Sequence, residues 1–333
     1  MKVVTDDMYG DHLRGVRHPE SADRVEVVAS RLAARGLLAA PVAARDATDG
    51  EIERVHSASY VELVKREIGS LDGARDLSTG DVTVDPRSLA VAVRAAGGAI
   101  VALETAANDN AATFALVRPP GHHAEQARGM GFCVFNNAAI AARAYQAVHG
   151  GRVLVVDFDY HHGNGTQDIA GEGLSYVSTH ASPAYPGTGF ETISIGRDVI
   201  ANVPLPSGGI ATEAFVAIWE QLLAKTAAYV RPSAIVVSAG FDYVKGDPVG
   251  DLGVDVAAAG ALAAAINRTA STYCNNRVAY ILEGGYAIDA LTDSIEQVLR
   301  SRCVIASSLG SADAASIPAA QRDLLDRVEA IVT

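Results

Sequence analysis

Arg152-Val153-Leu154-Val155-Val156 runs directly into Asp157-Phe158-Asp159-Tyr160-His161-His162-Gly163-Asn164-Gly165, and this stretch decides the fold. A continuous run of branched apolar residues is typical of an interior strand in a parallel sheet. In such sheets ligands bind just beyond the carboxyl ends of the strands, where these carboxylates and imidazoles follow. Asp159 and His161 are two residues apart, so on an extended backbone their side chains leave on the same side and can share one metal ion. The stretch therefore predicts half of a metal site at the end of a buried strand.

Along the rest of the chain, short branched apolar runs alternate with alanine-rich stretches of helical periodicity. This alternation is typical of an α/β fold in which a central parallel sheet carries helices on both faces. The predicted strands are residues 112–117, 152–158, 174–179, 234–238 and 278–282. The predicted helices are residues 88–107, 137–149, 212–230, 254–273 and 288–300. No linker, repeat or low-complexity boundary interrupts the pattern, so we expect a single domain over residues 1–333.

Two segments rich in glycine and proline, residues 182–189 and 204–209, lie between the predicted elements. We expect them to be long ordered loops of the kind that line active sites. After Cys303 the chain continues through mostly small residues, 304–318, and then through an amphipathic segment, 319–332. A helix packed on the domain is expected for the last segment, and neither segment is assigned a function.

The composition limits the class of protein. The chain has 333 residues and 49% hydrophobic content, enough for a large core. Its 39 acidic and 27 basic residues differ by 12, which makes the net charge −12. That charge argues against a nucleic-acid backbone as ligand and favours cationic substrates. A homo-oligomer is compatible with the sequence.

The three cysteines, Cys133, Cys274 and Cys303, are widely separated and odd in number. They suggest neither a disulfide framework nor a cysteine zinc site, so a reducing, cytoplasmic setting is expected. The N-terminal residues lack the apolar stretch of a secretory signal, and we expect no run of membrane-spanning length and no membrane partner.

A histidine pair lies in Arg118-Pro119-Pro120-Gly121-His122-His123-Ala124, directly after a predicted strand. Adjacent histidines on a loop with two prolines are poor core material. Because imidazoles titrate near neutral pH, the pair is suited to general base and general acid catalysis.

Two further predicted strands also end in functional residue types. Asp242 follows the apolar run 234–238 and could complete an Asp/His/Asp metal triad. Tyr286 follows Glu283-Gly284-Gly285, in which two glycines give the backbone freedom to place a phenol in a cleft. The glycine-rich turn at 185–189 is followed by neither a lysine nor a helix start, so a nucleotide-binding loop is excluded there.

In these motifs the sequence resembles the zinc-dependent histone deacetylase and acetylpolyamine amidohydrolase superfamily, in a bacterial, class II-like form. The resemblance implies a single-domain arginase/deacetylase-like fold. It covers roughly residues 18–286. The matching segments, in order, are His18-Pro19-Glu20, 118–124, Gly131-Phe132-Cys133, 157–166, 185–189, 240–248 and Gly284-Gly285-Tyr286.

For the metal, the resemblance implies that Asp159, His161 and Asp242 bind one Zn²⁺ per chain and leave positions open for water and the substrate carbonyl. It also implies a structural monovalent cation such as K⁺ behind the zinc, held by Asp157 and by backbone carbonyls near Asp159, His161 and Ser178. Iron and cobalt suit the same ligands, so the native metal stays open.

For catalysis, the resemblance implies that His123 is the base and that His122 is oriented by Asp157. Asn164 falls where many relatives have the aspartate that partners the second histidine, and the asparagine resembles the class II and bacterial form. An amide there should hold His123 by a hydrogen bond while raising its pKa less than a carboxylate would. Tyr286 would donate its hydroxyl to the oxyanion that forms opposite the zinc.

For the substrate, Phe132 and Tyr185 match the aromatic pair that forms a narrow tunnel around an acylated alkyl-amine chain, and Gly131 is assigned to substrate binding with them. Asp81 is expected at the mouth, where it would engage a cation or a peptide backbone. The acidic residues Asp6, Asp7 and Asp11 are expected nearby. Two polyamine-selective features are not visible, because the stretch 68–86 is short and Val249 stands where one such branch has a glutamate.

Three functions follow from this sequence. The first is a zinc-dependent amidohydrolase that removes an acyl group from N-acetyl-lysine-like, acetylpolyamine or related N-acyl-amine substrates. The second is a dinuclear manganese ureohydrolase of the same fold, although that reaction needs extra aspartates where residues 240–243 supply only Asp242. The third is a catalytically silent zinc-containing protein that binds acyl ligands, against which the intact His122, His123 and Tyr286 argue.

Overall fold

A nine-stranded sheet forms the centre of the computed structural model, which describes residues 1–301 and 314–332. In sheet order the strands are β2 (Val42–Ala43), β1 (Lys2–Thr5), β5 (Thr113–Ala115), β11 (Val278–Leu282), β10 (Ala234–Ala239), β6 (Val153–Asp157), β7 (Leu174–Ser182), β9 (Asp198–Pro206) and β8 (Thr192–Ile195). Neighbouring strands are parallel except for β8 and β9. All five predicted strands lie in this sheet, so the prediction of a mainly parallel α/β sheet is confirmed.

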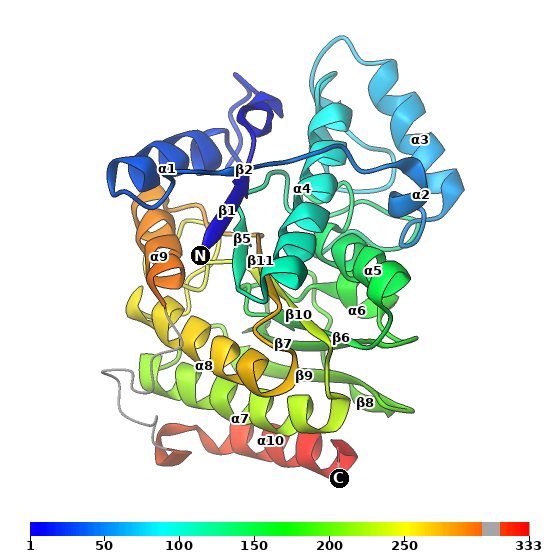
Figure 1. Cartoon of the computed structure of the whole chain (residues 1–333). Helices are drawn as coiled ribbons and strands as arrows, with labels where there is room; N and C mark the ends of the chain where they lie inside the picture. The colour runs from blue at the N-terminus through cyan, green and yellow to red at the C-terminus, as the bar shows by residue number, and fades with distance from the viewer. Residues whose placement is uncertain (302–313, 333) are drawn as a thin grey trace.

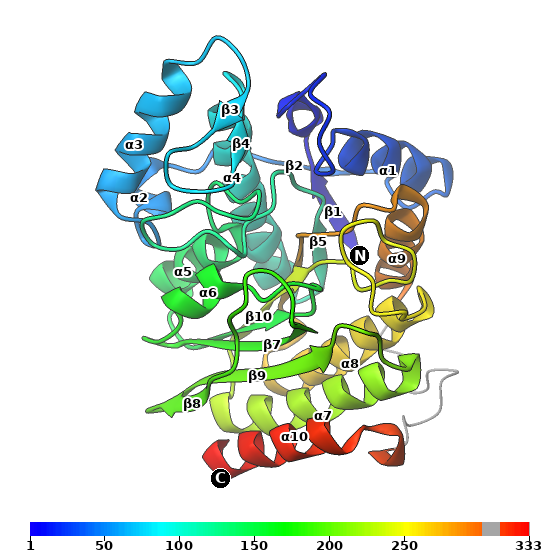
Figure 2. The ribbon, with the colours of Figure 1, turned by 180° about the vertical axis from the view of Figure 1, so that it is seen from behind.

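Helices cover both faces of the sheet (Figure 1). One side carries α2 (Asp49–Ile52), α3 (Ala58–Gly69), α4 (Ser88–Asp109), α5 (Asn137–His149) and α6 (Asn164–Ile169). The other side carries α1 (Asp23–Ala34), α9 (Ile288–Arg300), α8 (Ala257–Tyr273), α7 (Thr212–Val230) and α10 (Ala319–Val332). The 3₁₀ segments are η1 (Asp7–Asp11) and η2 (Ala314–Ser316). Away from the main sheet, β3 (Arg75–Asp76) and β4 (Thr83–Val84) form a small antiparallel pair near α3 (Figure 2).

The longest helix, α4, corrects one expectation. It is long and apolar enough to span a membrane by length and composition, although no run of that kind was expected. Within the structure, however, 61% of its apolar window is buried, and the helix packs against α5 and β11. Its apolar surface therefore belongs to the core.

The loop prediction for residues 204–209 is wrong at its start, because Pro204 and Pro206 lie in β9. Proline has no N–H to donate and is tolerated at a sheet edge. Strand β8 pairs only with residues 198–201 of β9, so the second half of β9 has no strand partner on that side among the described residues and accommodates both prolines. At residues 182–189, Ser182 still belongs to β7, and the loop begins after it.

The C-terminal helix α10 has the predicted bounds and packs on α7 and β9, as expected. Residues 302–313, which include Cys303 and most of the segment 304–318, lie outside the described residues.

The register of the sheet places the functional loops at one edge. Asp157 of β6 lies opposite Ser238 of β10 and Ser178 of β7, and Ala239 of β10 lies opposite Leu282 of β11. Because these strands are parallel, the loops that follow them leave from the same edge of the sheet. The sequence places its carboxylates, imidazoles and phenol in these loops.

Candidate metal centre and active site

Asp159, His161 and Asp242 form a compact cluster beyond the ends of β6 and β10. Their ligand atoms all lie within 4.8 Å of one another. His161 Nδ1 is 3.2 Å from Asp159 Oδ1 and 3.0 Å from Asp242 Oδ2. Within residues 1–301 and 314–332 this is the one cluster of its kind. The structure thus brings together the three residues that the sequence predicts as metal ligands.

Backbone donors hold both carboxylates toward the centre of the cluster. Gly284 N–H donates to Asp159 Oδ2 at 2.8 Å, and Tyr160 N–H donates to Asp242 Oδ1 at 3.0 Å. Asp242 Oδ2 is buried and meets no hydrogen-bond donor in suitable geometry among the described residues. A buried carboxylate oxygen without a donor is costly, and coordination of a cation would satisfy it.

Two glycines leave room for this cluster. A Cβ on Gly240 would lie 1.8 Å from Asp159 Oδ2, and one on Gly284 would lie 2.5 Å from Asp242 Oδ2. Any other residue at either position would displace a carboxylate. The glycines are therefore needed for close approach of the backbone to the ligands.

The charge of the cluster also favours a cation. Burial, together with the neighbouring Asp159 carboxylate, raises the pKa of Asp242 to about 6. Two buried carboxylates this close repel each other unless a positive charge lies between them. One imidazole and two carboxylates with an open side match the donor set of a catalytic Zn²⁺ site, so the residues present fit a zinc ion.

The histidine pair lies beside this cluster, and each ring has a different partner. His122 Nδ1 is 3.1 Å from Asp157 Oδ2, which also accepts a hydrogen bond from the Tyr176 hydroxyl at 2.9 Å. His123 Nδ1 is 2.8 Å from Asn164 Oδ1. The two ring centroids are 4.0 Å apart. The pairings expected from the sequence, His122 with Asp157 and His123 with Asn164, are present.

The two rings also differ in acidity. Burial alone would lower the pKa of His122, but the carboxylates of Asp159 and Asp157 outweigh it and raise that pKa to about 10. Burial lowers the pKa of His123 well below 6.5, and the neighbouring His122 and His161 lower it further. His122 is therefore suited to carry positive charge and His123 to be neutral, the form that can accept a proton.

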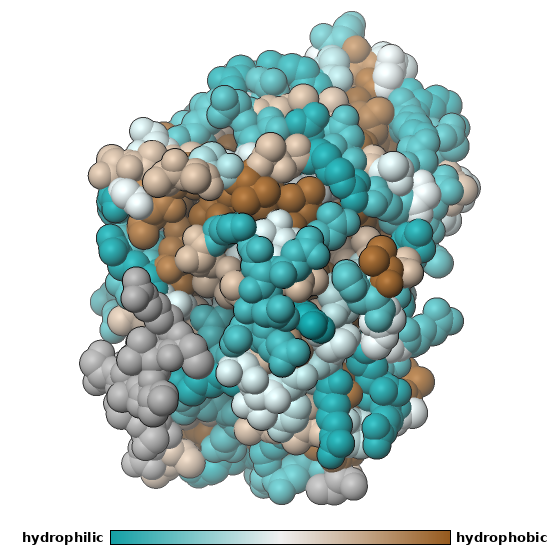
Figure 3. Space-filling model, viewed as in Figure 1, coloured by the Kyte–Doolittle hydropathy of each residue, from teal (hydrophilic) through white to brown (hydrophobic). Residues whose placement is uncertain are grey.

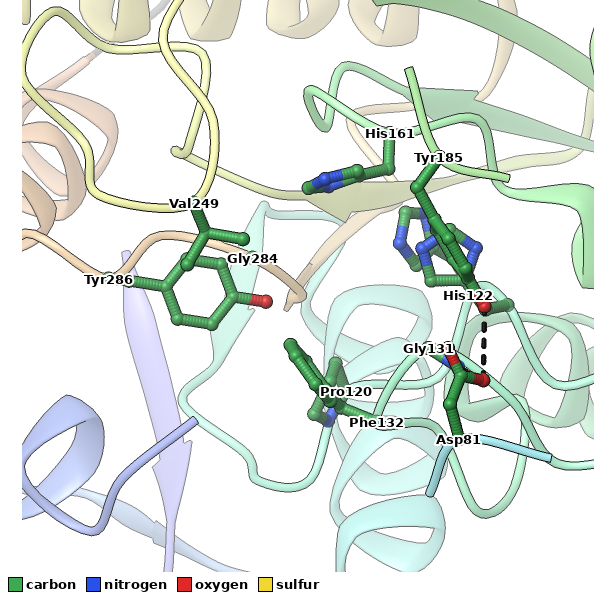
Figure 4. Close-up of a pocket in the computed structure, with 11 residues that line it drawn as sticks. Asp81, Pro120, His122, Gly131, Phe132, His161, Tyr185, Val249, Gly284 and Tyr286 are labelled. Atoms are coloured by element: carbon green, nitrogen blue, oxygen red, sulfur yellow. Dashed lines mark hydrogen bonds between the residues drawn. The ribbon is translucent and has the colours of Figure 1, made fainter. Parts of the chain in front are cut away.

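A cavity of about 270 Å³ opens onto these groups. The residues that line it are Asp81, Pro120, His122, His123, Gly131, Phe132, His161, Tyr185, Val249, Gly284 and Tyr286. Figure 4 shows the phenol oxygen of Tyr286 pointing into this cavity, with His161 and His122 on the far side. The cavity joins the metal cluster, the histidine pair and Tyr286, which come from loops far apart in the sequence.

Aromatic side chains form much of the cavity wall. The ring of Tyr185 packs edge-on against His123, with centroids 5.1 Å apart. The ring of Phe132 lies 6.2 Å from that of Tyr286 and 4.7 Å from that of His18. Phe132 has a φ of 68°, in the left-handed region where bulky residues are rare. The fold holds this ring in place despite an unfavourable backbone conformation.

At the mouth of the cavity, Asp81 is exposed and held from two sides. Its Oδ1 accepts hydrogen bonds from the Gly131 N–H at 3.0 Å and from the Tyr185 hydroxyl at 3.2 Å. Tyr185 therefore uses its hydroxyl to orient this carboxylate.

The other acidic residues expected near the mouth do not line the cavity. Asp6 pairs with Arg94 at 2.6 Å, and Asp11 pairs with Arg14 at 3.1 Å. Asp6 and Asp11 thus pair with arginines and, like Asp7, are not among the residues that line the cavity.

Sequence reasoning missed a buried group that supports Tyr286. Arg24 lies 4.8 Å from the centre of the Tyr286 ring and donates from Nε to the Gly285 carbonyl at 2.7 Å. Asp247 Oδ2 accepts from the backbone N–H groups of Tyr286 and Ala287 at 2.6 and 2.9 Å. Arg24 is four residues after Glu20, a spacing typical of exposed helix pairs, so nothing in the sequence signals its burial.

Glu283 is a second missed residue. It is fully buried, and its Oε2 accepts from the backbone N–H groups of Gly121 and His122 at 2.6 and 3.1 Å. Burial raises its pKa to about 7. The side chain thus anchors the loop that carries the histidine pair to the end of β11.

The family model described as Histone deacetylase domain matches residues 18–302. The chain is 35% identical to Histone deacetylase 15 of Arabidopsis thaliana over 85% of this chain and 52% of that protein. It is 31% identical to a Probable deacetylase of Archaeoglobus fulgidus over 86% of this chain and 81% of that protein. It is 34% identical to Polyamine deacetylase HDAC10 of Homo sapiens over 83% of this chain and 43% of that protein.

Among solved structures, the chain superposes on the Crystal Structure of HDA15 HD domain with a TM-score of 0.84 and 31% identity, over 99% of this chain and 95% of that chain. The plant and human relatives are longer proteins, of which this chain spans about half or less.

Proposed function

This chain belongs to the histone deacetylase family, and we propose that it is a metal-dependent deacetylase that hydrolyses the amide bond of an N-acetylated alkyl amine, with acetyl-lysine as the leading substrate type. The reaction adds water across the amide, which yields acetate and the free amine. The site residues act in the roles that the sequence predicts.

One observation carries the proposal. Three kinds of group meet at one cavity. They are the open Asp159/His161/Asp242 cluster, the His123 imidazole, which is suited to be neutral, and the Tyr286 phenol. Hydrolysis of an amide needs activation of the carbonyl, a base for water and a donor to the developing oxyanion. These three groups supply the three requirements, which supports a hydrolase over a protein that only binds acyl ligands.

His123 is the proposed base. Its Nδ1 faces Asn164, which leaves Nε2 to accept a proton from the attacking water. As the water oxygen bonds to the carbonyl carbon and the C–N bond breaks, the proton passes to the leaving amine. His122, paired with Asp157, supplies positive charge beside the reacting group.

Tyr286 is the proposed oxyanion donor. Burial raises the pKa of its phenol well above 10, so the hydroxyl keeps its proton at neutral pH. A neutral phenol that points into the cavity can donate a hydrogen bond to the carbonyl oxygen as that oxygen gains negative charge.

Asp159, His161 and Asp242 would hold the metal ion, which we propose to be zinc at one per chain. When bound, zinc would polarise the carbonyl and make water more acidic. The dinuclear manganese alternative lacks support, because no second group of this kind occurs in the described ranges 1–301 and 314–332. A structural K⁺ at Asp157 stays a prediction.

The walls of the cavity support a slender alkyl chain as the substrate's reacting arm. Phe132 and Tyr185 offer apolar ring faces to methylenes, and Asp81 offers a carboxylate at the mouth to an N–H or ammonium donor. Val249 lines the cavity without charge, so no second carboxylate attracts a distal ammonium there. This favours acetyl-lysine peptides over acetylated polyamines.

The test measures kcat/KM of the zinc-loaded protein on an acetyl-lysine peptide and on an N-acetylated diamine, each with a chelator control. We expect turnover of both, a preference for the peptide, and loss of both activities after chelation. A strong preference for the diamine, on the order of a hundredfold or about 2.7 kcal/mol, would instead assign the enzyme to polyamines. Equal turnover with and without chelator would overturn the proposed function.

A further inference from the structure

The Asn164 side chain lies between His123 and a second polar residue, Glu125. Asn164 Oδ1 is 2.8 Å from His123 Nδ1, and Asn164 Nδ2 is 2.7 Å from Glu125 Oε1. The same Nδ2 is 3.3 Å from Met130 Sδ. Glu125 thus contacts the amide on the side opposite the histidine.

The chemistry of these groups fixes the orientation of the amide. An ionised carboxylate only accepts hydrogen bonds, and a thioether sulfur is a weak acceptor, so the NH₂ group of Asn164 must face Glu125 and Met130. The Asn164 carbonyl oxygen then faces His123 and can only accept. His123 must therefore carry its proton on Nδ1, and a neutral ring has its lone pair on Nε2.

We propose that Glu125 is a positioning residue that sets the tautomer of His123 through the Asn164 amide. This inference rests on the proposed function, because that function needs the lone pair on Nε2. Glu125 touches no reacting atom and acts only through Asn164.

The backbone of Glu125 is held firmly enough for such a role. Its N–H donates to the Arg128 carbonyl at 2.9 Å, and its carbonyl accepts from His56 Nδ1 at 2.9 Å. His56 Nε2 in turn accepts from the Asn136 N–H at 2.9 Å, at the start of α5. Asn164 is the first residue of α6 and is itself buried. Both members of the pair are fixed by the fold.

The arrangement also explains why an asparagine needs a partner here. An aspartate at position 164 would accept from His123 with either oxygen and would need no orientation. It would, however, place a second carboxylate beside Glu125 and be repelled. Glu125 and Asn164 therefore form a matched pair. A substitution at position 164 should change which side chain at position 125 gives the highest kcat.

The test uses a graded series at position 125. Glu125→Gln can accept or donate, so it removes the preference for one amide orientation, and we expect a few-fold loss of kcat. Glu125→Lys can only donate, so it should turn the amide and force the proton of His123 to Nε2. We expect that variant to lose kcat on the order of a hundredfold, the scale of general base catalysis, with little change in KM.

A double substitution separates this role from a structural one. In an Asn164→Asp background the amide is gone, and a lysine at position 125 relieves the repulsion between two carboxylates. We expect Glu125→Lys to raise kcat in that background, the opposite of its effect on the wild type. Glu53→Lys makes the same charge change at an exposed residue that directly follows α2, so it is the matched control and should leave kcat unchanged.

The tautomer of His123 can be measured directly, and this measurement does not depend on which substrate the enzyme uses. With ¹⁵N-labelled histidine and zinc-loaded protein, His123 is assigned by comparison with His123→Ala. We expect Nδ1 protonated and Nε2 unprotonated in the wild type, and the reverse in Glu125→Lys. An unchanged tautomer in Glu125→Lys, or an equal loss of kcat in both backgrounds, would overturn the role of Glu125. Absence of wild-type turnover would overturn the proposed function alone, since the tautomer measurement would still decide this inference.

Discussion

Tyr286 is the residue whose substitution separates catalysis from metal binding most cleanly. Tyr286→Phe removes one hydroxyl from the cavity and leaves Asp159, His161 and Asp242 in place. We expect kcat to fall by about a hundredfold or more, because one oxyanion donor commonly contributes that much. Steady-state kinetics with a zinc assay on the same sample checks this. Unaltered kcat with full zinc content would remove the tyrosine from the mechanism.

Asp81 should affect substrate binding more than chemistry. Its carboxylate lies at the mouth and is held by Gly131 and Tyr185, away from the metal cluster. We expect Asp81→Ala to raise KM for an acetyl-lysine peptide by about tenfold, the scale of one charged hydrogen bond, with kcat little changed. Tyr185→Phe should give a smaller increase, because it only frees the carboxylate. A fall in kcat without a change in KM would contradict this role.

At the residue scale, the residues that the sequence predicts as ligands and catalytic groups lie together around one cavity, because strand ends in a parallel sheet concentrate functional side chains. The sequence did not predict Arg24 or Glu283 as supports. Both are fully buried and bind backbone groups of distant loops, and such contacts depend on tertiary packing that leaves no periodic signal.

Between elements, a buried ion network joins α1 to the loop after β5. Glu20 Oε1 accepts from Arg24 Nη1 at 2.9 Å and from Arg118 Nε at 2.7 Å, and all three side chains are fully buried. Glu20→Gln would leave two guanidinium groups uncompensated, which costs about 3–5 kcal/mol in comparable buried pairs.

Urea unfolding would measure this loss. Glu62→Gln, which breaks an exposed pair with Lys65, is the control and should cost less than about 1 kcal/mol. Similar losses for the two variants would show that the buried network contributes no more than a surface pair.

His56 makes the stability of the folded protein sensitive to acid. Burial lowers the pKa of His56 to about 4, although bonds to backbone carbonyls oppose the shift. The unfolded chain binds a proton near pH 6.5 and the folded chain only near pH 4, so stability is lost as pH falls through that window. At pH 5 the loss from this residue is about 2 kcal/mol.

The measurement is the free energy of unfolding at pH 7 and pH 5 for the wild type and for His56→Gln. The variant should be less stable at pH 7 but should lose less stability on acidification. An identical pH dependence in both proteins would exclude His56 as the titrating group.

At the element scale, helices α5, α7 and α9 have the predicted bounds, since propensity and periodicity coincide there. In α5 the Asn136 side chain also caps the first turn by accepting from the Ala139 N–H. Strands β1 and β9 were not predicted. Strand β1 has only four residues, and β9 contains two prolines, so neither gives a clear strand signal in isolation.

For the whole molecule, the net charge of −12 supports amine substrates that become cationic after deacetylation and argues against nucleic acid. On the face shown in Figure 3 hydrophilic side chains predominate, and apolar ones gather mainly beside α1. A cytoplasmic location, the absence of membrane and nucleic-acid partners, and a possible homo-oligomer stay predictions. The mainly parallel sheet could be predicted from the alternation of apolar runs and helical stretches in the sequence. The order of the strands could not be predicted, because it depends on pairing between segments far apart in the chain.

The measurement that tests the account most directly is a zinc titration of the metal-stripped protein, followed by deacetylation of an acetyl-lysine peptide. We expect activity to rise linearly and to stop at one zinc per chain. Asp242→Ala, which removes one ligand but leaves the histidine pair, should bind zinc weakly and stay inactive at that ratio. Full activity in the stripped protein, or activity that requires two metal ions per chain, would contradict a mononuclear metal-dependent deacetylase.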